Sequence, residues 1–410
     1  MTINSKKNQI ERELERNNGI LQLLPSWVAR NILPPGKRLK LDTRDLYIRG
    51  GERGPICERW LASTCLADNG DLTVENEGLS FIAINGGEDK ILLKEAIEIL
   101  GDKIIGKDTM EKYKGLISFA KLYDFACPIP HHVHLQGKDA ARVGVTPKPE
   151  AYYYPVQLNF HNYGHDYTFF GFENGTSREE IIRCLKDWER TGDTRILEYS
   201  KAYKITPGTG WNIPTGILHS PGSLVTYEPQ RVSDAAFFFQ SVIHDNYMNK
   251  DMLTKFAPQD KRADYNYYID ALDWDANVDP DFKKNHYHEP IPVDDMGSML
   301  DSGYIEKWIA YGAEDFSAKE LTVLPGQTVK IKDSASYGLI MMEGYGTINE
   351  VKIETPSIIR YGDITADEMF VSKQAAEEGV TIKNLSDFSN IVMLKQFGPD
   401  NSEALKFLGK

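Results

Sequence analysis

The sequence has few cysteines, and none of the four stands in a CxxC pair. A chain of 410 residues with so few cysteines is unlike a disulfide-stapled protein. We expect all four to be reduced and structural: Cys57, Cys65, Cys127 and Cys184. The sequence also lacks an apolar run of about 18 residues, which excludes a transmembrane helix. Its first residues, MTINSKKNQIERELERNNG, contain no apolar signal-peptide segment, so we expect a cytoplasmic protein.

Basic residues are outnumbered: 47 Lys and Arg stand against 60 Asp and Glu, for a net charge of -13. Nucleic-acid binding needs a basic stripe, so this balance predicts no nucleic-acid partner. A local Lys or Arg pair is still enough to hold one phosphate, so a phosphorylated small molecule is not excluded. Hydrophobic residues make up 41% of the chain, which is enough for a large core and, at this length, for two domains.

Short strand-like segments separated by Gly and Pro turns recur in two blocks, one ending near Val242 and one spanning 321–395. Even spacing of short strands is typical of jelly rolls and barrels. Apolar residues at helical spacing predict helices over 3–24, 92–106 and 177–191. We interpret the polar, Asp- and Tyr-rich residues 243–300 as a linker with irregular packing.

The histidines include one set with metal-ligand character. In HHVHLQ, His132 and His134 are two residues apart, so on a strand both imidazoles point to the same face. Glu150 follows in KPEAYYYP, and GTGWNIPTGILH ends at His219. This last stretch fits the second cupin signature, G-x5-P-x-G-x2-H, in which a Gly- and Pro-shaped turn carries the His into a barrel. Three imidazoles and one carboxylate suit Zn first, with Mn, Fe, Ni or Co as alternatives.

The other histidines have simpler interpretations. His131 points to the opposite strand face and is expected to be structural. His161 and His165, in HNYGHD, are expected on a polar rim rather than among the ligands. Three more lie in polar stretches and carry no functional prediction: His244, His286 and His288.

Motifs across about residues 45–400 resemble, in order, the type I phosphomannose isomerase family, also called mannose-6-phosphate isomerases. The matching stretches are CERWLAS, ISFAKLYDFACPIPHHVHLQ, FFGFENGTSREEIIRCL, IPTGILHSPGSLVTYEPQRVSD, EGYGTI and ADEMFVS. Lys148-Pro149-Glu150 matches a Lys-Pro-Glu motif in which the Glu binds metal and the Lys is a candidate acid or base. The resemblance implies a metal-dependent aldose–ketose isomerase that transfers a proton through an enediol.

The resemblance and the strand pattern together predict the site residues. Lys148 and Glu228 are the predicted catalytic pair. The predicted substrate-binding residues are Lys121, Tyr152 and Tyr154, the two tyrosines sharing a strand face with Glu150. The predicted metal ligands are His132, His134, Glu150 and His219.

Two positions depart from the family pattern. The family has Gln-x-His where this chain has His132 and His134, which favours Zn, Ni or Co over harder ions. The family also has an arginine where SDAAFF places Phe238, and an apolar ring cannot hold a phosphate or stabilise an enediolate. We therefore keep three alternatives open: an isomerase of unphosphorylated sugar, another metal cupin enzyme such as a dioxygenase, and a non-catalytic sugar-binding cupin.

We predict a mainly β fold with two cupin (jelly-roll β-barrel) domains, an N-terminal helical extension and a helical insertion. The predicted limits are an extension over 1–45, a metal-binding cupin over 46–245 with its insertion at 176–192, a linker and packing segment over 246–317, and a metal-free cupin over 318–410. The predicted partner is a sugar or sugar phosphate, and no membrane partner is expected. A homodimer is one option for the oligomeric state.

Overall fold

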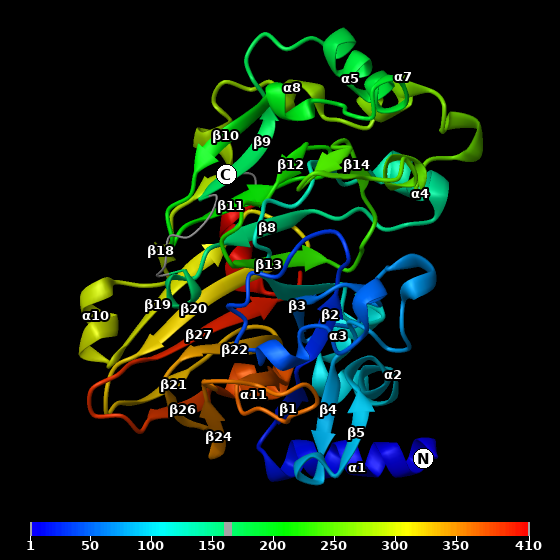
Figure 1. Ribbon diagram of the computed structural model, residues 1–410. Helices are drawn as coiled ribbons and strands as arrows, with labels where there is room; N and C mark the ends of the chain where they lie inside the picture. The colour runs from blue at the N-terminus through cyan, green and yellow to red at the C-terminus, as the bar shows by residue number, and fades with distance from the viewer. Residues whose placement is uncertain (1, 160–165, 409–410) are drawn as a thin grey trace.

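The computed structural model describes residues 2–159 and 166–408, and in these ranges the chain is mainly β. Four large sheets form two sandwiches, one drawn above the other in Figure 1. The upper sandwich comes mainly from residues 118–288, with two further strands from residues 26–61. The lower one combines the C-terminal third with strands from the N-terminal region. This is the mainly β, double-cupin architecture that the sequence predicts, whereas the exact domain limits stay a prediction.

A seven-stranded and a five-stranded antiparallel sheet, counted over the described residues, form the upper sandwich. The seven-stranded sheet contains, in order, β17 (Tyr287–His288), β11 (Gly210–Ile213), β8 (Glu150–Tyr153), β13 (Thr226–Arg231), β6 (Ser118–Tyr123), β3 (Ile56–Leu61) and β2 (Ser26–Ala29). The five-stranded sheet contains β10 (Ser200–Lys204), β9 (Tyr167–Phe172), β12 (His219–Ser220), β7 (His132–Val133) and β14 (Phe237–Phe238). A short hairpin of β15 (Val242–Ile243) and β16 (Asn246–Tyr247) follows.

The lower sandwich consists, in the same described ranges, of a nine-stranded and a four-stranded sheet. The larger sheet contains β18 (Ile291–Pro292), β19 (Tyr304–Ala310), β20 (Ser317–Val323), β27 (Ile391–Phe397), β22 (Tyr337–Glu343), β25 (Glu368–Val371), β1 (Ile20–Leu24), β4 (Phe81–Ile84) and β5 (Asp89–Leu92). The smaller sheet contains β21 (Thr328–Ile331), β26 (Val380–Asn384), β23 (Tyr345–Ile348) and β24 (Val351–Glu354). Apolar side chains of both sheets fill the space between them.

The two sandwiches meet through their largest sheets. Ala151 and Tyr153 of β8 and Tyr227 of β13 pack against side chains of β19, β20, β22 and β27. Because side chains alternate along a strand, the neighbouring residues Glu150, Tyr152 and Glu228 point the other way, into the upper sandwich. The packing between the sandwiches therefore fixes which side chains face the interior.

Short helices cover the sheets. Their bounds are α1 (Ile3–Arg16), α2 (Leu93–Ile104), α3 (Lys107–Tyr113), α4 (Gly137–Val143), α5 (Arg178–Arg190), α6 (Asp251–Thr254), α7 (Tyr265–Asp270), α8 (Trp274–Asn277), α9 (Phe282–His286), α10 (Met296–Asp301) and α11 (Lys373–Glu378). The predicted helical insertion is α5, which begins with a capping box between Ser177 and Glu180. Its buried face, with Ile181 and Leu185, joins the apolar cluster on the five-stranded sheet. In the described part of the chain, every helix is too short or too polar to cross a bilayer.

Two secondary-structure predictions were wrong in part. The helix expected over 3–24 ends at Arg16, and Ile20–Leu24 forms β1 because Asn18 and Gly19 adopt positive φ angles of 49° and 82° and turn the chain. The segment 243–300 is more ordered than a linker. It folds into several short helices, and apolar residues such as Leu253 and Tyr268 are buried in the cluster that covers the five-stranded sheet.

A group of charged side chains is buried inside the lower sandwich. Lys319 and Lys395 both donate hydrogen bonds to the Asp333 carboxylate, at 2.7 and 2.6 Å. Glu306 forms a further ion pair with Lys395. These four side chains are at most 5% exposed, so each charge depends on its partners rather than on water.

Replacing Lys395 with Met should lower the free energy of unfolding by about 3–5 kcal/mol, because Asp333 and Glu306 stay buried with one cation fewer. Urea unfolding followed by tryptophan fluorescence measures the change. Lys352→Met is the control, since the Lys352–Glu354 pair is exposed and contributes little. A loss no larger than that of the control would contradict the prediction.

Candidate metal centre and active-site cavity

Three histidines converge inside the upper sandwich. His132 on β7 is the cross-strand partner of His219 on β12, so the five-stranded sheet places them side by side. His134 follows two residues after His132 and points to the same side. Together with Glu150, these residues offer ligand atoms that all lie within 4.8 Å of one another. The sequence therefore predicted a set that the fold brings together.

Backbone carbonyls fix the orientation of each imidazole. The Nδ1 atoms of His132, His134 and His219 lie 2.7, 2.9 and 2.8 Å from the carbonyl oxygens of residues 130, 235 and 217. A carbonyl oxygen only accepts, so each Nδ1 carries the proton and each Nε2 keeps its lone pair for a metal. The three rings are thus held in the tautomer that a metal ligand needs.

Burial keeps two of these rings neutral. It lowers the pKa of His132 well below its usual value, with the neighbouring His219 acting in the same direction. It also lowers the pKa of His134 to about 4, where the nearby Lys148 ammonium contributes. Neutral imidazole is the form that binds metal, so these rings need not lose a proton at neutral pH.

Glu150 completes the set from the opposite sheet. Its carboxylate is fully buried, and its oxygens lie 3.1 Å from the Nε2 atoms of His134 and His219. Burial alone would raise its pKa, but the charge of Lys148 lowers it well below the usual value. Glu150 Oε1 and His219 Nε2 face each other as two acceptors, so they form no hydrogen bond together, and both are buried without another partner among the described residues. Unsatisfied atoms of this kind, in a set of three nitrogens and one oxygen, fit a divalent cation.

Lys148 and Glu228 lie beside the metal group. The Lys148 ammonium donates to Glu150 Oε2 at 2.5 Å and to Glu228 Oε1 at 3.0 Å. Burial would lower the pKa of Lys148, but the charges of Glu150 and Glu228 outweigh it and raise the pKa. Burial and the charge of Glu150 raise the pKa of Glu228, against the effect of Lys121 and Lys148. The two residues of the predicted catalytic pair therefore form a buried, hydrogen-bonded ion pair next to the candidate ligands.

Lys121 comes from the neighbouring strand. It faces Glu228 in the β6–β13 ladder, and its Nζ lies 3.1 Å from Glu228 Oε1. Glu228 is thus held between two lysines, one of which also reaches the metal group.

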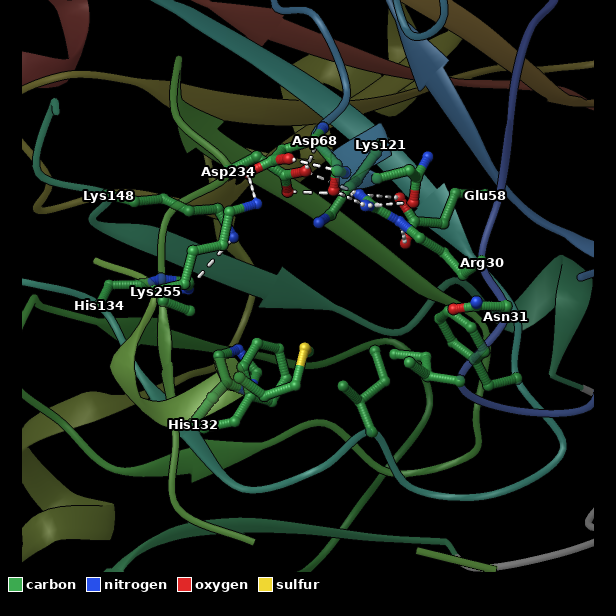
Figure 2. Close-up of a pocket in the computed structure, with 18 of the residues that line it drawn as sticks. Arg30, Asn31, Glu58, Asp68, Lys121, His132, His134, Lys148, Asp234 and Lys255 are labelled. Atoms are coloured by element: carbon green, nitrogen blue, oxygen red, sulfur yellow. Dashed lines mark hydrogen bonds and ion pairs between the residues drawn. The ribbon is translucent and has the colours of Figure 1, made fainter. Parts of the chain in front are cut away.

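A cavity of about 310 Å³ opens beside these groups. Lys121, Lys148, Glu228, His132 and His134 line it, as Figure 2 shows for four of them. Two of the predicted substrate-binding residues, Lys121 and Tyr152, are among the lining residues. Tyr154 is not among the described residues that line it, since it packs in the aromatic core with Phe170 and Trp211.

Phe238 lies at the position where the resembling family has its arginine. Its ring stacks on His132, with centroids 5.2 Å apart and planes at 27°. It lines the cavity with Phe125, Ile129 and Phe256, so this wall is apolar. Phe238 supports an imidazole and does not supply a positive charge.

The cavity also contains residues that the sequence did not single out. Arg30, Asp68 and Lys255 line it from three separate loops. Asp234 contacts Arg30 and the Asp68 backbone, while Lys255 pairs with Asp68. Asp234, by contrast, belongs to the Ser-Asp pair noted in the sequence. No periodic pattern marks the three loop residues, so the sequence carried no signal for them.

The remaining histidines do not join the metal group in the described structure. His131 lies on the opposite strand face, as predicted, and contacts Gln240 Oε1 and Ser200 Oγ at 3.0 and 2.7 Å. His161 and His165 lie outside the described residues.

The fold and this four-residue group define a double cupin with a candidate metal centre. No family model and no curated protein matches the sequence. Solved structures do match the fold. They include a proposed mannosephosphate isomerase from Archaeoglobus fulgidus, with 17% identity, a TM-score of 0.60 and coverage of 92% of this chain and 97% of that one.

Mannose 6-phosphate isomerase from Bacillus subtilis is also similar, at 15% identity and a TM-score of 0.56 over 92% of this chain and 99% of that one. A zinc-bound mannose 6-phosphate isomerase matches at 12% identity and a TM-score of 0.58, over 93% and 99% of the two chains. The chain therefore has the fold of phosphomannose isomerases along nearly its whole length.

His219→Ala should remove most of the metal that the purified protein retains, because a buried four-ligand set loses one nitrogen donor. Inductively coupled plasma mass spectrometry measures the metal content. A chelator should lower the melting temperature of the wild type more than that of this variant, since metal binding stabilises the folded state.

His244→Ala is the matched control, because His244 is an exposed histidine outside the metal group. Equal metal content in His219→Ala and His244→Ala would contradict a metal site at these four residues.

Proposed function

We propose that the chain is a metal-dependent aldose–ketose isomerase. The carrying observation is the Lys148–Glu228 pair, which lies inside the cavity and beside the four candidate ligands. The shared fold with mannose 6-phosphate isomerases supports the same reaction class. The zinc-bound state of one of these similar structures supports zinc as the cofactor.

Aldose–ketose interconversion moves a proton between two adjacent carbons and requires proton exchange at their oxygens. A base must remove the carbon-bound proton, and an acid must supply a proton or hydrogen bond to an oxygen. A divalent ion held by the four ligands would polarise the sugar oxygens and lower the pKa of the neighbouring C–H bond.

Glu228 is the proposed base. Burial and the Glu150 charge raise its pKa above the usual range, which makes its carboxylate a stronger base than an exposed one. Lys121 and Lys148 both contact Glu228 Oε1 and hold the carboxylate in place. The base is thus both strengthened and oriented by its surroundings.

Lys148 is the proposed acid. Its pKa is raised because Glu150 and Glu228 outweigh the effect of burial, so the side chain stays an ammonium at neutral pH. An ammonium in this position can donate to a sugar oxygen while Glu228 exchanges a proton with the carbon. The buried floor of the cavity, where both side chains are at most 5% exposed, excludes bulk water from this exchange.

Glu228→Gln and Lys148→Met should each lower kcat by roughly 10²–10⁴-fold, the range of a lost general acid or base. The assay follows ketose formation from a panel of aldoses and deuterium uptake into the sugar from D₂O. Both variants should retain metal, because neither side chain belongs to the ligand set.

Glu320→Gln is the control, since Glu320 is a partly buried carboxylate that accepts from Tyr153 Oη at 2.7 Å outside the cavity. Full activity in the Glu228 and Lys148 variants would contradict their roles. Oxygen consumption with substrate would instead indicate an oxygenase, and sugar binding without turnover a binding protein.

A further inference from the structure

The positive charges around the cavity are all paired. In the described part of the chain, every lysine and arginine that lines the cavity forms an ion pair with a carboxylate. The cations are Arg30, Arg53, Lys121, Lys148 and Lys255. A phosphate group on a substrate would therefore have to compete with a protein carboxylate wherever it met a cation.

The ion pairs lie at different depths. Lys148 and Glu228 are 5% and 4% exposed, whereas Lys255 and Asp68 are 44% and 33% exposed. The first pair is therefore at the floor, beside the metal group, and the second pair is at the mouth. A sugar whose reacting carbons lie at the floor would extend its far end towards Lys255 and Asp68.

Arg30 lies between these levels and has no free donor for a phosphate. Its Nε donates to Glu58 at 3.0 Å and its Nη2 to Asp234 at 3.0 Å. Its Nη1 donates to the Asp68 carbonyl oxygen and to Asn69 Oδ1 at 3.1 and 3.2 Å. This guanidinium ties three segments of the chain together and is already saturated.

Two carboxylates lie at the mouth, those of Asp68 and Asp234. Lys255 Nζ donates to Asp68 Oδ2 at 2.5 Å. Burial would raise the pKa of Asp68, but the hydrogen bond from Lys255 lowers it. Asp234 accepts from the Asp68 backbone N–H at 2.9 Å, which brings a second carboxylate to the same region. A phosphate dianion would meet like charge here, whereas sugar hydroxyls can donate to carboxylates and accept from Lys255 or Asn69.

We propose that this cavity takes an unphosphorylated aldose, and that the Asp68–Lys255 pair excludes the phosphorylated sugar. The proposal rests on the proposed function, because it places the reacting carbons at the metal group. Asp68 is a specificity-determining residue in this arrangement. It holds the ammonium that a phosphate would otherwise bind.

The first experiment compares D-mannose and D-mannose 6-phosphate, and D-glucose and D-glucose 6-phosphate, on the zinc-loaded full chain. We expect kcat/KM for the free sugar to exceed that for its phosphate by roughly tenfold or more, which is the effect of one charge-assisted hydrogen bond. Higher kcat/KM for the phosphorylated sugars would overturn the inference about the substrate, but it would still support the proposed isomerase activity.

Isothermal titration calorimetry with the same four sugars separates the two proposals. Tighter binding of the free sugars without turnover would overturn the proposed function but support the preference of the cavity for unphosphorylated sugars. Tighter binding of the phosphates without turnover would overturn both.

The second experiment tests the residue. Asp68→Asn should shift the ratio of kcat/KM towards the phosphorylated sugar by roughly tenfold, because Lys255 becomes free to bind phosphate. The double variant Asp68→Asn with Lys255→Gln should lose this shift. Glu354→Gln, which removes the exposed carboxylate paired with Lys352, is the control and should leave the ratio unchanged. An unchanged ratio in Asp68→Asn, or a shift that survives the loss of Lys255, would overturn the role of the pair.

Discussion

The structure of the site depends on one buried carboxylate. Glu150 has no access to solvent, and a carboxylate in such a place is tolerated only if positive charge and hydrogen-bond donors surround it. Lys148 supplies the charge, and the imidazoles of His134 and His219 lie against its oxygens. The Nε2 lone pairs of these rings cannot donate to the carboxylate, so the remaining positive charge would come from a cation held by Glu150 and the histidines. The buried carboxylate therefore brings the candidate ligands and Lys148, the proposed acid, into one group.

Strand alternation on β8 connects this group to the rest of the molecule. One face of the strand carries Glu150 and Tyr152 towards the cavity, and the other carries Ala151 and Tyr153 into the contact between the sandwiches. A shift of register by one residue would exchange the two sets. Packing between the two sandwiches therefore fixes the register that positions the site residues, although none of the described residues of the lower sandwich is a candidate metal ligand.

The sequence predicted the parts of the site that follow from local rules. His132 and His134 share a face because of the strand period, and the turn before His219 has a recognisable Gly and Pro pattern. Arg30, Asp68 and Lys255 could not be predicted, because they come from irregular loops that only the tertiary structure brings together. Tyr154 was predicted to bind substrate because it shares a strand face with Glu150. Its side chain instead packs in the aromatic core and does not line the cavity. At the N-terminus, the apolar residues continue at helical spacing past Asn18 and Gly19, where the helix ends, so β1 was predicted as helix.

The pairing of β1 with β25 has a consequence for synthesis of the protein. Ile20 is the register partner of Val371, so a strand made among the first residues completes its sheet only after nearly the whole chain has been translated. Contacts of such large sequence separation form slowly because a long loop must close first. The upper sandwich takes its strands from residues 26–288, all of which are translated before β25, so it can assemble earlier on the ribosome. The N-terminal strand would then dock last, as the final step of cotranslational folding.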